Sequence, residues 1–284
     1  MTATVTTLGV ILIAFMLREV FLDLFHHAQS GTVSDGIARM VFAAIRPRPS
    51  LLSLAGPLSV ALVILAWFFL LALGFALVYW PRLLAEYKDL TANRPFLESL
   101  YLSFATMTTL GYSDISPNAL GLRLVTTIQS LLGFALVTAS VSWIVLLFPA
   151  LARCRTLARN VTNLNTAERD IGLSAEMSFS DEIVFGLASA VTQLRVDLEH
   201  FPIVYFFRSS TRRGSLPTAL PCLVRIANGR LDMQCPDGVR LGCGTLHTAL
   251  LELACKLGES FVNADPNDMP AVFAAYYEHH RSDK

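Results

Sequence analysis

Residues 95–117 read PFLESLYLSFATMTTLGYSDISP, and this stretch sets the requirements for the rest of the chain. Asn93 and Pro95 are typical of a helix start, and the apolar residues that follow predict a helix of about three turns. A helix of roughly 13 residues is too short to cross a bilayer, which takes about 20. Because a glycine-containing loop follows, we predict a re-entrant hairpin whose backbone is sheltered by protein or water.

Two long uncharged runs flank the hairpin. Residues 49–81 hold 33 positions without Asp, Glu, Lys, Arg or His, and residues 124–152 hold another 29. Each run can cross a bilayer with some tilt, and a weaker apolar block at 4–25 gives a third candidate span. Only 15% of the residues are charged, against roughly 25% in soluble domains, which excludes an ordinary soluble globule. We therefore predict an all-α membrane protein with three transmembrane helices, a re-entrant segment between the second and third, and a mainly helical C-terminal domain.

The arginines that flank these spans predict the orientation of the chain. Between the first two spans lie Arg39, Arg46 and Arg48, and directly after the third lie Arg153, Arg155 and Arg159. Basic residues favour the cytoplasmic side, so we expect the N-terminus outside the plasma membrane and the C-terminal part in the cytoplasm. The formal net charge is zero, which gives no indication of nucleic-acid binding.

The end of the first span carries Arg18, Glu19 and Asp23. Ionisable groups inside a membrane are often functional. The alternative, which we favour, is that this end emerges at the surface, where Arg18 snorkels and the acids meet water. In the linker that follows, Ser34 or Asp35 is expected to cap a short helix on the inner membrane surface. The apolar positions expected along one face of this helix are Ile37, Met40, Val41 and Ala44.

The hairpin resembles the pore helix and selectivity filter of the potassium channel family, whose usual form ends TTVGYGDxxP. The residues on matching positions are Thr108, Thr109, Gly111, Tyr112, Asp114 and Pro117, with Leu110 in place of the usual valine. The match is close over residues 95–117 and extends in layout over residues 51–150. It is specific because the motif follows a short helix, lies between two uncharged spans and faces outward by the charge rule.

This resemblance implies a homotetrameric cation channel that conducts potassium passively, without a cofactor. Potassium channels are the standard example of a filter whose stacked oxygens replace the water shell of the ion, with four chains turning each oxygen into a ring. The ion-binding positions implied here are Thr108, Thr109, Leu110, Gly111, Tyr112 and Ser113. Gly111 supplies the positive φ that such a backbone needs. Asp114 would form a carboxylate ring at the outer mouth, while Tyr101 and Phe104 would support the filter beside Tyr112.

One filter position departs from the family pattern. The second filter glycine is Ser113 in this chain, and a non-glycine residue in left-handed geometry costs on the order of 1 kcal/mol or more. We expect the outermost carbonyl ring to be altered while the inner rings survive. Two alternatives therefore stay open: a non-selective cation channel, and a non-conducting membrane scaffold or sensor that keeps the hairpin.

The third span corresponds to the inner helix of that family. Gly133 lies in its middle, where it serves either as a hinge or as a site of close helix packing. The residues that repeat along the same face at intervals of four are Val137, Val141 and Val145. Rings of these valines would form a dewetting gate, whereas the alternative is a stripe that faces lipid or another helix.

The C-terminal part is expected to be helical, with two amphipathic stripes. The first consists of Val184, Leu187, Val191, Leu194 and Leu198, and the second of Leu246, Leu250, Leu253, Leu257 and Phe261. Such stripes usually form a core, although four copies could instead associate as a bundle. The cysteines form no CxxC pair, and a zinc site around Cys243 and His247 would lack matched spacings, so we expect no metal beyond the permeant cation. His279 and His280 are expected in an exposed tail without a specific role.

The predicted organisation has four parts. These are an N-terminal transmembrane helix (1–26), a cytoplasmic interfacial linker (27–50), a pore module (51–152) and a cytoplasmic regulatory domain (153–284). No catalytic constellation and no nucleotide-binding glycine motif stands out, so the chain is not expected to be an enzyme. The expected partners are further copies of the chain, membrane lipids and an unidentified cytoplasmic ligand.

Overall fold

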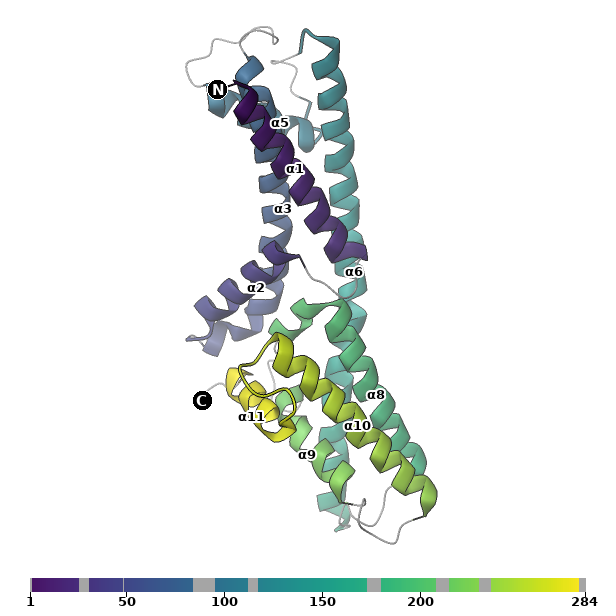
Figure 1. Cartoon of the computed structure of the whole chain (residues 1–284). Helices are drawn as coiled ribbons and strands as arrows, with labels where there is room; N and C mark the ends of the chain where they lie inside the picture. The colour runs from purple at the N-terminus through teal and green to yellow at the C-terminus, as the bar shows by residue number, and fades with distance from the viewer. Residues whose placement is uncertain are drawn as a thin grey trace. The chain divides into compact units, whose positions relative to one another are not determined.

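A computed structural model gives the structure of the protein. It describes residues 2–25, 31–47, 49–83, 95–111, 117–172, 180–207, 215–229 and 236–280. The chain divides into two compact units, the first made of Met1–Ile37 and Val60–Val145, the second of Ala38–Ser59 and Leu146–Lys284. The ordered elements of the described residues are all helices (Figure 1), which confirms the predicted all-α class.

Three helices are long and apolar enough to cross a membrane, as predicted. They are α1 (Thr2–Phe25), α3 (Ala55–Tyr79) and α6 (Leu120–Ile171). A 3-10 segment, η1 (Pro49–Leu54), precedes α3, so the regular helix begins a few residues later than the uncharged run does. A second 3-10 turn, η2 (Trp80–Arg82), follows it.

Helix α6 is much longer than the span expected at 120–151, because it continues to Ile171. Residues 152–171 contain no glycine or proline and include four Arg and three Ala, both good helix formers, so nothing in this segment interrupts the helix. Gly172 follows with a φ of 70°, the left-handed conformation that commonly ends a helix. Pro149 lies inside the helix without ending it.

In the first unit, α1 packs closely against α3 where two glycines meet. A Cβ atom added at Gly9 would lie 2.7 Å from the carbonyl oxygen of Gly74, and one at Gly74 would lie 2.8 Å from Cγ1 of Ile13. Small residues that let two backbones approach are the usual contact between membrane helices. Further along α3, Trp67 packs on Trp143 of α6 with ring centroids 5.3 Å apart.

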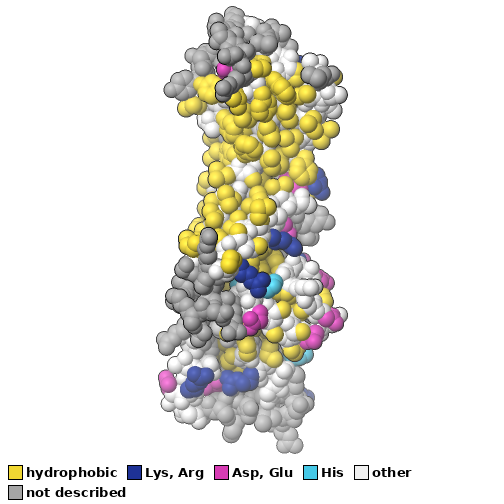
Figure 2. Space-filling model, turned by 90° about the vertical axis from the view of Figure 1, so that its left-hand side faces the viewer, with side chains coloured by type: hydrophobic (Ala, Val, Ile, Leu, Met, Phe, Trp, Pro, Cys, Tyr) yellow, Lys and Arg dark blue, Asp and Glu magenta, His cyan; other side chains and the backbone are white. Residues whose placement is uncertain are grey.

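The outer surface of the first unit is largely apolar. On the face seen in Figure 2, hydrophobic side chains cover most of its visible surface, and most of the charged side chains in view lie on the second unit. Exposed large hydrophobic residues of the membrane helices include Leu8, Phe21, Leu65, Leu131 and Phe134. Such a surface is stable against lipid or another apolar chain rather than in water.

Helix α2 (Thr32–Ile45) begins earlier than the sequence suggested, and the two acids of α1 explain why. The Glu19 carboxylate accepts hydrogen bonds from the Val33 amide (3.0 Å) and the Thr32 hydroxyl (3.2 Å). Asp23 accepts from the Gly31 amide at 2.8 Å and from the Ser34 hydroxyl. Carboxylates from another helix thus satisfy the first amides of α2, where we had expected Ser34 or Asp35 to be the cap.

The environment predicted for these acids was also wrong. We expected Glu19 and Asp23 to meet water, but Glu19 is fully buried. The predicted apolar face of α2 differs as well, since Met40 is 71% exposed while Ala38, Val41 and Phe42 are buried.

The second unit is built on a pair of helices that run in the same direction and bury the two predicted stripes against each other. Its further elements are α8 (Asp181–His200), η3 (Pro202–Phe206), α9 (Leu216–Asn228), α10 (Asp237–Ser260) and α11 (Met269–His280). The leucines and valines of both stripes are buried within this one chain, and α8 and α10 pack directly on each other. The stripes therefore form a core, which confirms the prediction that we favoured over a four-chain bundle.

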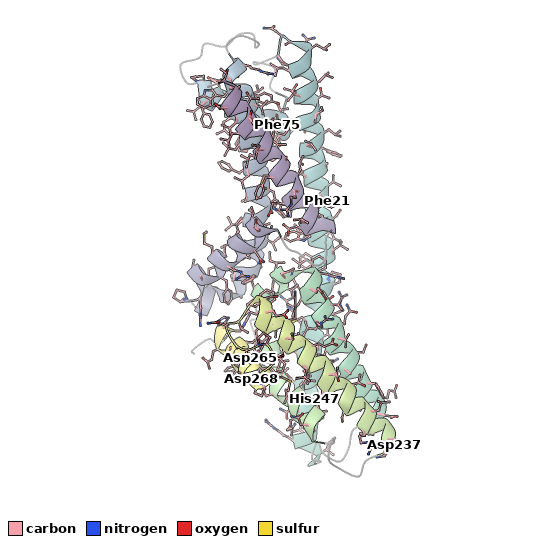
Figure 3. The ribbon with its side chains drawn as sticks, viewed as in Figure 1. Phe21, Phe75, Asp237, His247, Asp265 and Asp268 are labelled. Atoms are coloured by element: carbon pink, nitrogen blue, oxygen red, sulfur yellow. The ribbon has the colours of Figure 1, made fainter. Side chains whose placement is uncertain are left out.

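The entry into α11 is fixed by an aspartate. In Figure 3, Asp265 and Asp268 lie in the turn that leads from α10 to α11. The Asp268 carboxylate accepts a 3.0 Å hydrogen bond from the Ala271 amide, which caps the first turn. Cys243 of α10 is fully buried, and its thiol lies 3.7 Å from the carbonyl oxygen of Ile226, in keeping with the structural role expected for this thiol.

Candidate functional site

The predicted short helix forms as α5 (Pro95–Met107), and its end has an unusual conformation. The Thr109 amide donates to the carbonyl of Thr106 (3.1 Å), and the Leu110 amide donates to that of Ala105 (3.0 Å). This pair of bonds is the Schellman arrangement that usually has glycine at its left-handed position. Here Thr109 occupies that position with a φ of 57°.

A second left-handed residue, Gly111, lies two positions after Thr109. Its φ is 64°, as the sequence predicted. A β-branched residue at positive φ is a rare and costly conformation, and backbone strain of this kind clusters at functional sites. The strain at Thr109 was not predicted, because the resemblance called for positive φ at glycine alone.

The residues of this loop are open in the single chain. Thr108, Thr109, Leu110 and Gly111 are all exposed, and Leu110 is 61% exposed although it is apolar. This strained loop is therefore open to contact with solvent, an ion or another chain. The remaining positions of the predicted filter and mouth, Tyr112, Ser113 and Asp114, lie outside the described residues.

A buried chain of hydrogen bonds holds α5 between the two spans. The Tyr79 hydroxyl donates to Oε1 of Gln129 at 2.6 Å. Nε2 of Gln129 donates to the hydroxyl of Ser103 (2.7 Å) and to its carbonyl (3.0 Å). The Ser103 hydroxyl in turn donates to the carbonyl of Ala72 at 2.7 Å. We call Tyr79, Gln129, Ser103 and Ala72 the polar clamp; all four residues are fully buried.

Aromatic contacts hold α5 against η2 at one further point and against α3 at another. Phe96 lies edge-on to Trp80 with centroids 5.3 Å apart, and Phe104 lies 6.2 Å from Phe69. Phe104 thus contacts an aromatic ring of α3, while Tyr101 is 40% exposed. Both were predicted to support the filter beside Tyr112, a contact that falls outside the described residues.

Gly133 lies where α6 passes the end of α5. A Cβ atom at this position would overlap the carbonyl oxygen of Met107, the last residue of α5. Of the two roles that the sequence left open, close packing has a direct structural basis here, and the hinge stays a prediction. The glycine lets α6 touch the backbone at the end of α5, directly before the loop that begins at Thr108.

The three valines that were predicted to form a gate on α6 are exposed in the single chain. Val137, Val141 and Val145 are 47%, 56% and 61% exposed. They share one face of α6, and this face is exposed in the part of the chain that the structure describes. The exposure fits either a pore-facing or a lipid-facing stripe.

Within the second unit, an ion pair that the sequence did not predict joins the inner end of α6 to α8. The Arg153 guanidinium donates two hydrogen bonds to the carboxylate of Asp197 in α8, from Nε to Oδ2 at 2.8 Å and from Nη2 to Oδ1 at 2.6 Å. Asp197 is 2% exposed. The sequence does hold a signal for this ion pair. Asp197 lies between Leu194 and Leu198 on a predicted buried stripe, and a buried carboxylate needs a partner.

The polar clamp left a weaker signal in the sequence. Gln129 is the only amide side chain in the uncharged run 124–152, and an amide at membrane depth must be hydrogen-bonded.

Among the residues that the structure describes, no group of three or more His, Cys, Asp or Glu side chains comes together as a metal site.

Comparison with known proteins finds a similarity in the same region. Residues 60–148 match a family model described as "Ion channel" (Ion_trans_2). The chain is also 28% identical over 178 residues to "Uncharacterized membrane protein YdjJ" of Bacillus subtilis (strain 168), which covers 61% of this chain and 52% of that protein. The chain thus spans about half the length of the curated relative it matches. No solved structure matches it.

Proposed function

We propose that four copies of the chain form a cation channel that conducts potassium passively, because residues 60–148 of this membrane protein match a family model described as "Ion channel". No cofactor is consumed, because ions move down their electrochemical gradient. The observation that carries the proposal is the exposed loop that turns through positive φ at Thr109 and again at Gly111. One chain supplies one column of oxygens, so four chains are needed to surround an ion.

The pore helix adds a favourable field to this loop. The C-terminal end of a helix carries partial negative charge, which stabilises a nearby cation. In this chain, α5 ends at Met107 directly before the loop, and it is held there by the polar clamp and by the contact of Gly133. The ion-binding positions that we propose are Thr108, Thr109, Leu110, Gly111, Tyr112 and Ser113, with Asp114 at the outer mouth.

The proposal assigns a direction to the molecule. The hairpin faces outward in the plasma membrane, the N-terminus of α1 lies outside, and the second unit lies in the cytoplasm. The arginines that flank the spans support this orientation. The partners proposed are three further copies of the chain, the surrounding lipids and a cytoplasmic ligand that acts on the second unit.

Selectivity is tested by reconstituting the protein in liposomes and measuring reversal potentials under opposed potassium and sodium gradients. A reversal potential near the potassium equilibrium value supports the proposal. Equal permeabilities would make the protein a non-selective cation channel, with Ser113 as the cause if Ser113→Gly restores discrimination. Absence of flux in both the native protein and Ser113→Gly would favour a non-conducting scaffold.

Two further measurements test the assignment of the filter. Thr109→Cys replaces the innermost hydroxyl by a thiol, so barium block from the cytoplasmic side should weaken; Thr126→Cys, on α6, is the matched control. Unchanged barium block in Thr109→Cys would remove Thr109 from the filter. Chemical crosslinking in mild detergent should stop at a tetramer, and a monomer alone would overturn the pore proposal.

A further inference from the structure

A groove on the first unit borders the beginning of α1 and the end of η2. It has a volume of about 600 Å³, and sites for small molecules usually measure roughly 300–1,000 Å³. The residues that line it are Thr2, Ala3, Thr6, Thr7 and Val10 of α1, with Pro81 and Arg82 of η2. None of them belongs to the filter loop or to the polar clamp, so the groove is separate from the candidate channel site.

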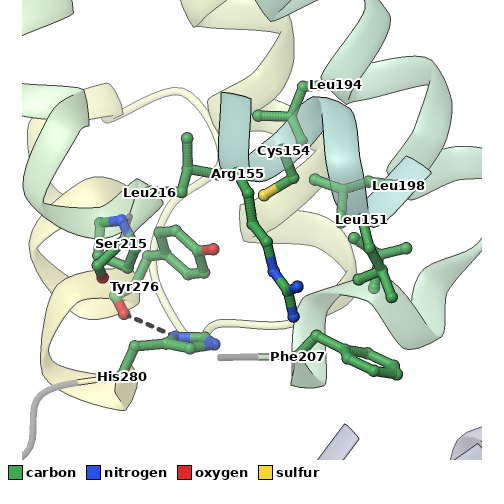
Figure 4. A pocket seen from close by; sticks show the side chains of 12 residues that line it. Leu151, Cys154, Arg155, Leu194, Leu198, Phe207, Ser215, Leu216, Tyr276 and His280 are labelled. Carbon is green, nitrogen blue, oxygen red and sulfur yellow. Dashed lines mark hydrogen bonds between the residues drawn. The ribbon is translucent and has the colours of Figure 1, made fainter. Parts of the chain in front are cut away.

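The second unit holds a much smaller cavity, which Figure 4 shows. Its volume is about 30 Å³, room for roughly one water molecule. His280 lies in its wall and is 4% exposed, because its ring packs on Phe42 and Tyr205. His279 is held as well, with Nδ1 2.8 Å from the hydroxyl of Tyr205, so the exposed tail that we predicted for the two histidines is wrong. This cavity is too small for an organic ligand.

The groove of the first unit lies where two candidate spans end together. Gly9 of α1 contacts Gly74 of α3, and α1 also packs on η2. Thr2 lies seven positions before Gly9, and Arg82 lies eight positions after Gly74, so both ends reach nearly the same level. The 24 residues of α1 measure about 36 Å, more than the hydrocarbon core of about 30 Å. The groove therefore lies at the level of the lipid headgroups, where tryptophans such as Trp80, 39% exposed, are enriched.

The threonines of the groove are compatible with acyl chains. The Thr6 hydroxyl donates to the carbonyl of Thr2 at 3.1 Å, and the Thr7 hydroxyl donates to that of Ala3 at 2.8 Å. A hydroxyl in an apolar environment is costly unless it is hydrogen-bonded, and both are bonded within their own helix. Together with Val10, which is 53% exposed, they form a wall that can contact a hydrocarbon chain.

Arg82 supplies the charge of the groove. Its side chain is exposed at the end of the second candidate span, and it is the one ionisable residue among the seven that line the groove. A guanidinium binds phosphate by paired hydrogen bonds, and an arginine near the end of a membrane helix reaches the headgroup level. Since no acidic side chain lines the described groove, its charge favours an anion.

We propose that this groove binds an anionic phospholipid, with the headgroup phosphate at Arg82 and one acyl chain along Thr6, Thr7 and Val10. A free phosphate ion offers the same charge, but it leaves the apolar part of the wall uncovered, whereas a phospholipid covers both parts. The bound lipid would join α1 to the end of α3. In the proposed orientation it belongs to the outer leaflet, and the site does not depend on whether the chain conducts ions.

The test is native mass spectrometry of the full-length protein in mild detergent. The protein is titrated separately with dioleoyl phosphatidylglycerol, dioleoyl phosphatidylcholine and inorganic phosphate. We expect one phosphatidylglycerol per chain to bind more tightly than phosphatidylcholine, whose choline cation is repelled by Arg82. Arg82→Gln should weaken this binding about fivefold, the contribution of one basic residue near a lipid surface, and Arg82→Lys should restore most of it. Thr7→Trp fills the groove and should remove this lipid.

Two matched controls test for unspecific lipid binding. Arg123→Gln changes an exposed arginine near the start of α6, and Leu8→Trp enlarges a side chain of α1 that is 57% exposed; neither residue lines the groove. Both variants should bind phosphatidylglycerol as the native protein does. If Thr7→Trp does not fold, Ala3→Phe fills the same groove in its place.

Four outcomes would overturn the proposal. The first is equal binding of the two lipids, and the second is equal weakening in Arg82→Gln and Arg123→Gln. The third is retention of the lipid in the variant that fills the groove. The fourth is displacement of phosphatidylglycerol by inorganic phosphate at equal concentration, because the ligand would then be the free anion.

Discussion

Gln129 of α6 holds Ser103 of α5 by two hydrogen bonds from a single nitrogen, Nε2, at 2.7 Å to the hydroxyl and 3.0 Å to the carbonyl. Both residues are fully buried. Ser103 lies five positions before Thr108, in the middle of the pore helix. The position of the filter loop therefore depends on an amide in a different helix, in a region where an unpaired polar group is costly.

Replacing Gln129 by methionine should loosen the pore helix. The substitution keeps the length of the side chain but leaves the Tyr79 hydroxyl without its acceptor and removes two donors to Ser103. Hydrogen bonds between membrane helices contribute about 0.6 kcal/mol each on average, so we expect a loss of about 1–2 kcal/mol. Thermal unfolding in detergent measures this loss, and potassium flux in liposomes measures its effect on the filter.

A conservative pair of variants distinguishes the clamp from general packing. Thr127→Val changes an exposed side chain on the same helix, whose hydroxyl bonds only to the carbonyl of Arg123 in its own backbone, and should leave both measurements unchanged. Tyr79→Phe removes one of the three hydrogen bonds that Gln129→Met removes, and should cost about a third as much. If Gln129→Met unfolds at the same temperature as the native protein, the clamp does not stabilise the pore helix.

The hairpin could be predicted from the sequence because its signals are local. Pro95 and the run of apolar residues after it mark a helix, and its length rules out a span. The clamp could not be predicted, because which faces of α3, α5 and α6 meet depends on crossing angles and contacts between segments far apart in the chain. Gln129 indicated that a partner must exist, but it did not identify Ser103.

The predictions that Glu19 and His280 are exposed were wrong for the same reason. Both were expected at the surface because charged or titratable residues near the end of an element usually reach water. Each is instead buried by a segment distant in sequence, Glu19 by the start of α2 and His280 by η3 and Phe42. Their partners are mainly backbone groups, which no pattern of side chains identifies.

Gly133→Ala should disrupt the contact between the inner helix and the filter loop. The new Cβ would overlap the carbonyl oxygen of Met107, which is backbone and cannot rotate away. We expect a loss of about 1–3 kcal/mol from the overpacking, together with loss of ion flux. Tetramer recovery after heating and flux in liposomes measure the two effects.

Gly121→Ala is the matched control for this variant. It lies on the same helix, and a Cβ there would meet nothing within 4 Å. Because alanine is the better helix former by about 0.5–1 kcal/mol, the control should be neutral or slightly stabilising. If Gly133→Ala and Gly121→Ala behave alike, Gly133 is not a packing site. Larger residues at position 133 would then test whether it is a hinge.

Gly9→Ala should separate α1 from α3. The added Cβ would lie 2.7 Å from the carbonyl oxygen of Gly74, again a backbone atom. We expect a loss of about 1–3 kcal/mol in thermal stability. Ion flux should fall less than in Gly133→Ala, since Gly9 contacts α3 whereas Gly133 contacts the end of α5. Gly36→Ala in α2, where a Cβ meets nothing within 4 Å, is the control; a matching loss there would assign the effect to something other than the helix contact.

Asp197→Asn should weaken the attachment of α8 to the inner end of α6. Asp197 is 2% exposed and holds Arg153 by two bonds of 2.6 and 2.8 Å, so the asparagine leaves the guanidinium with one acceptor instead of two. Breaking a fully buried pair costs about 3–5 kcal/mol, but the Arg153 side chain is 46% exposed, so we expect about 2 kcal/mol. Arg195→Gln, which breaks the two solvent-exposed pairs with Glu199 and Glu252, should cost less than about 1 kcal/mol. A double-mutant cycle with Arg153→Gln isolates the pair, and a coupling energy near zero would mean that Asp197 is held by its other contacts, such as Gln193, instead of by Arg153.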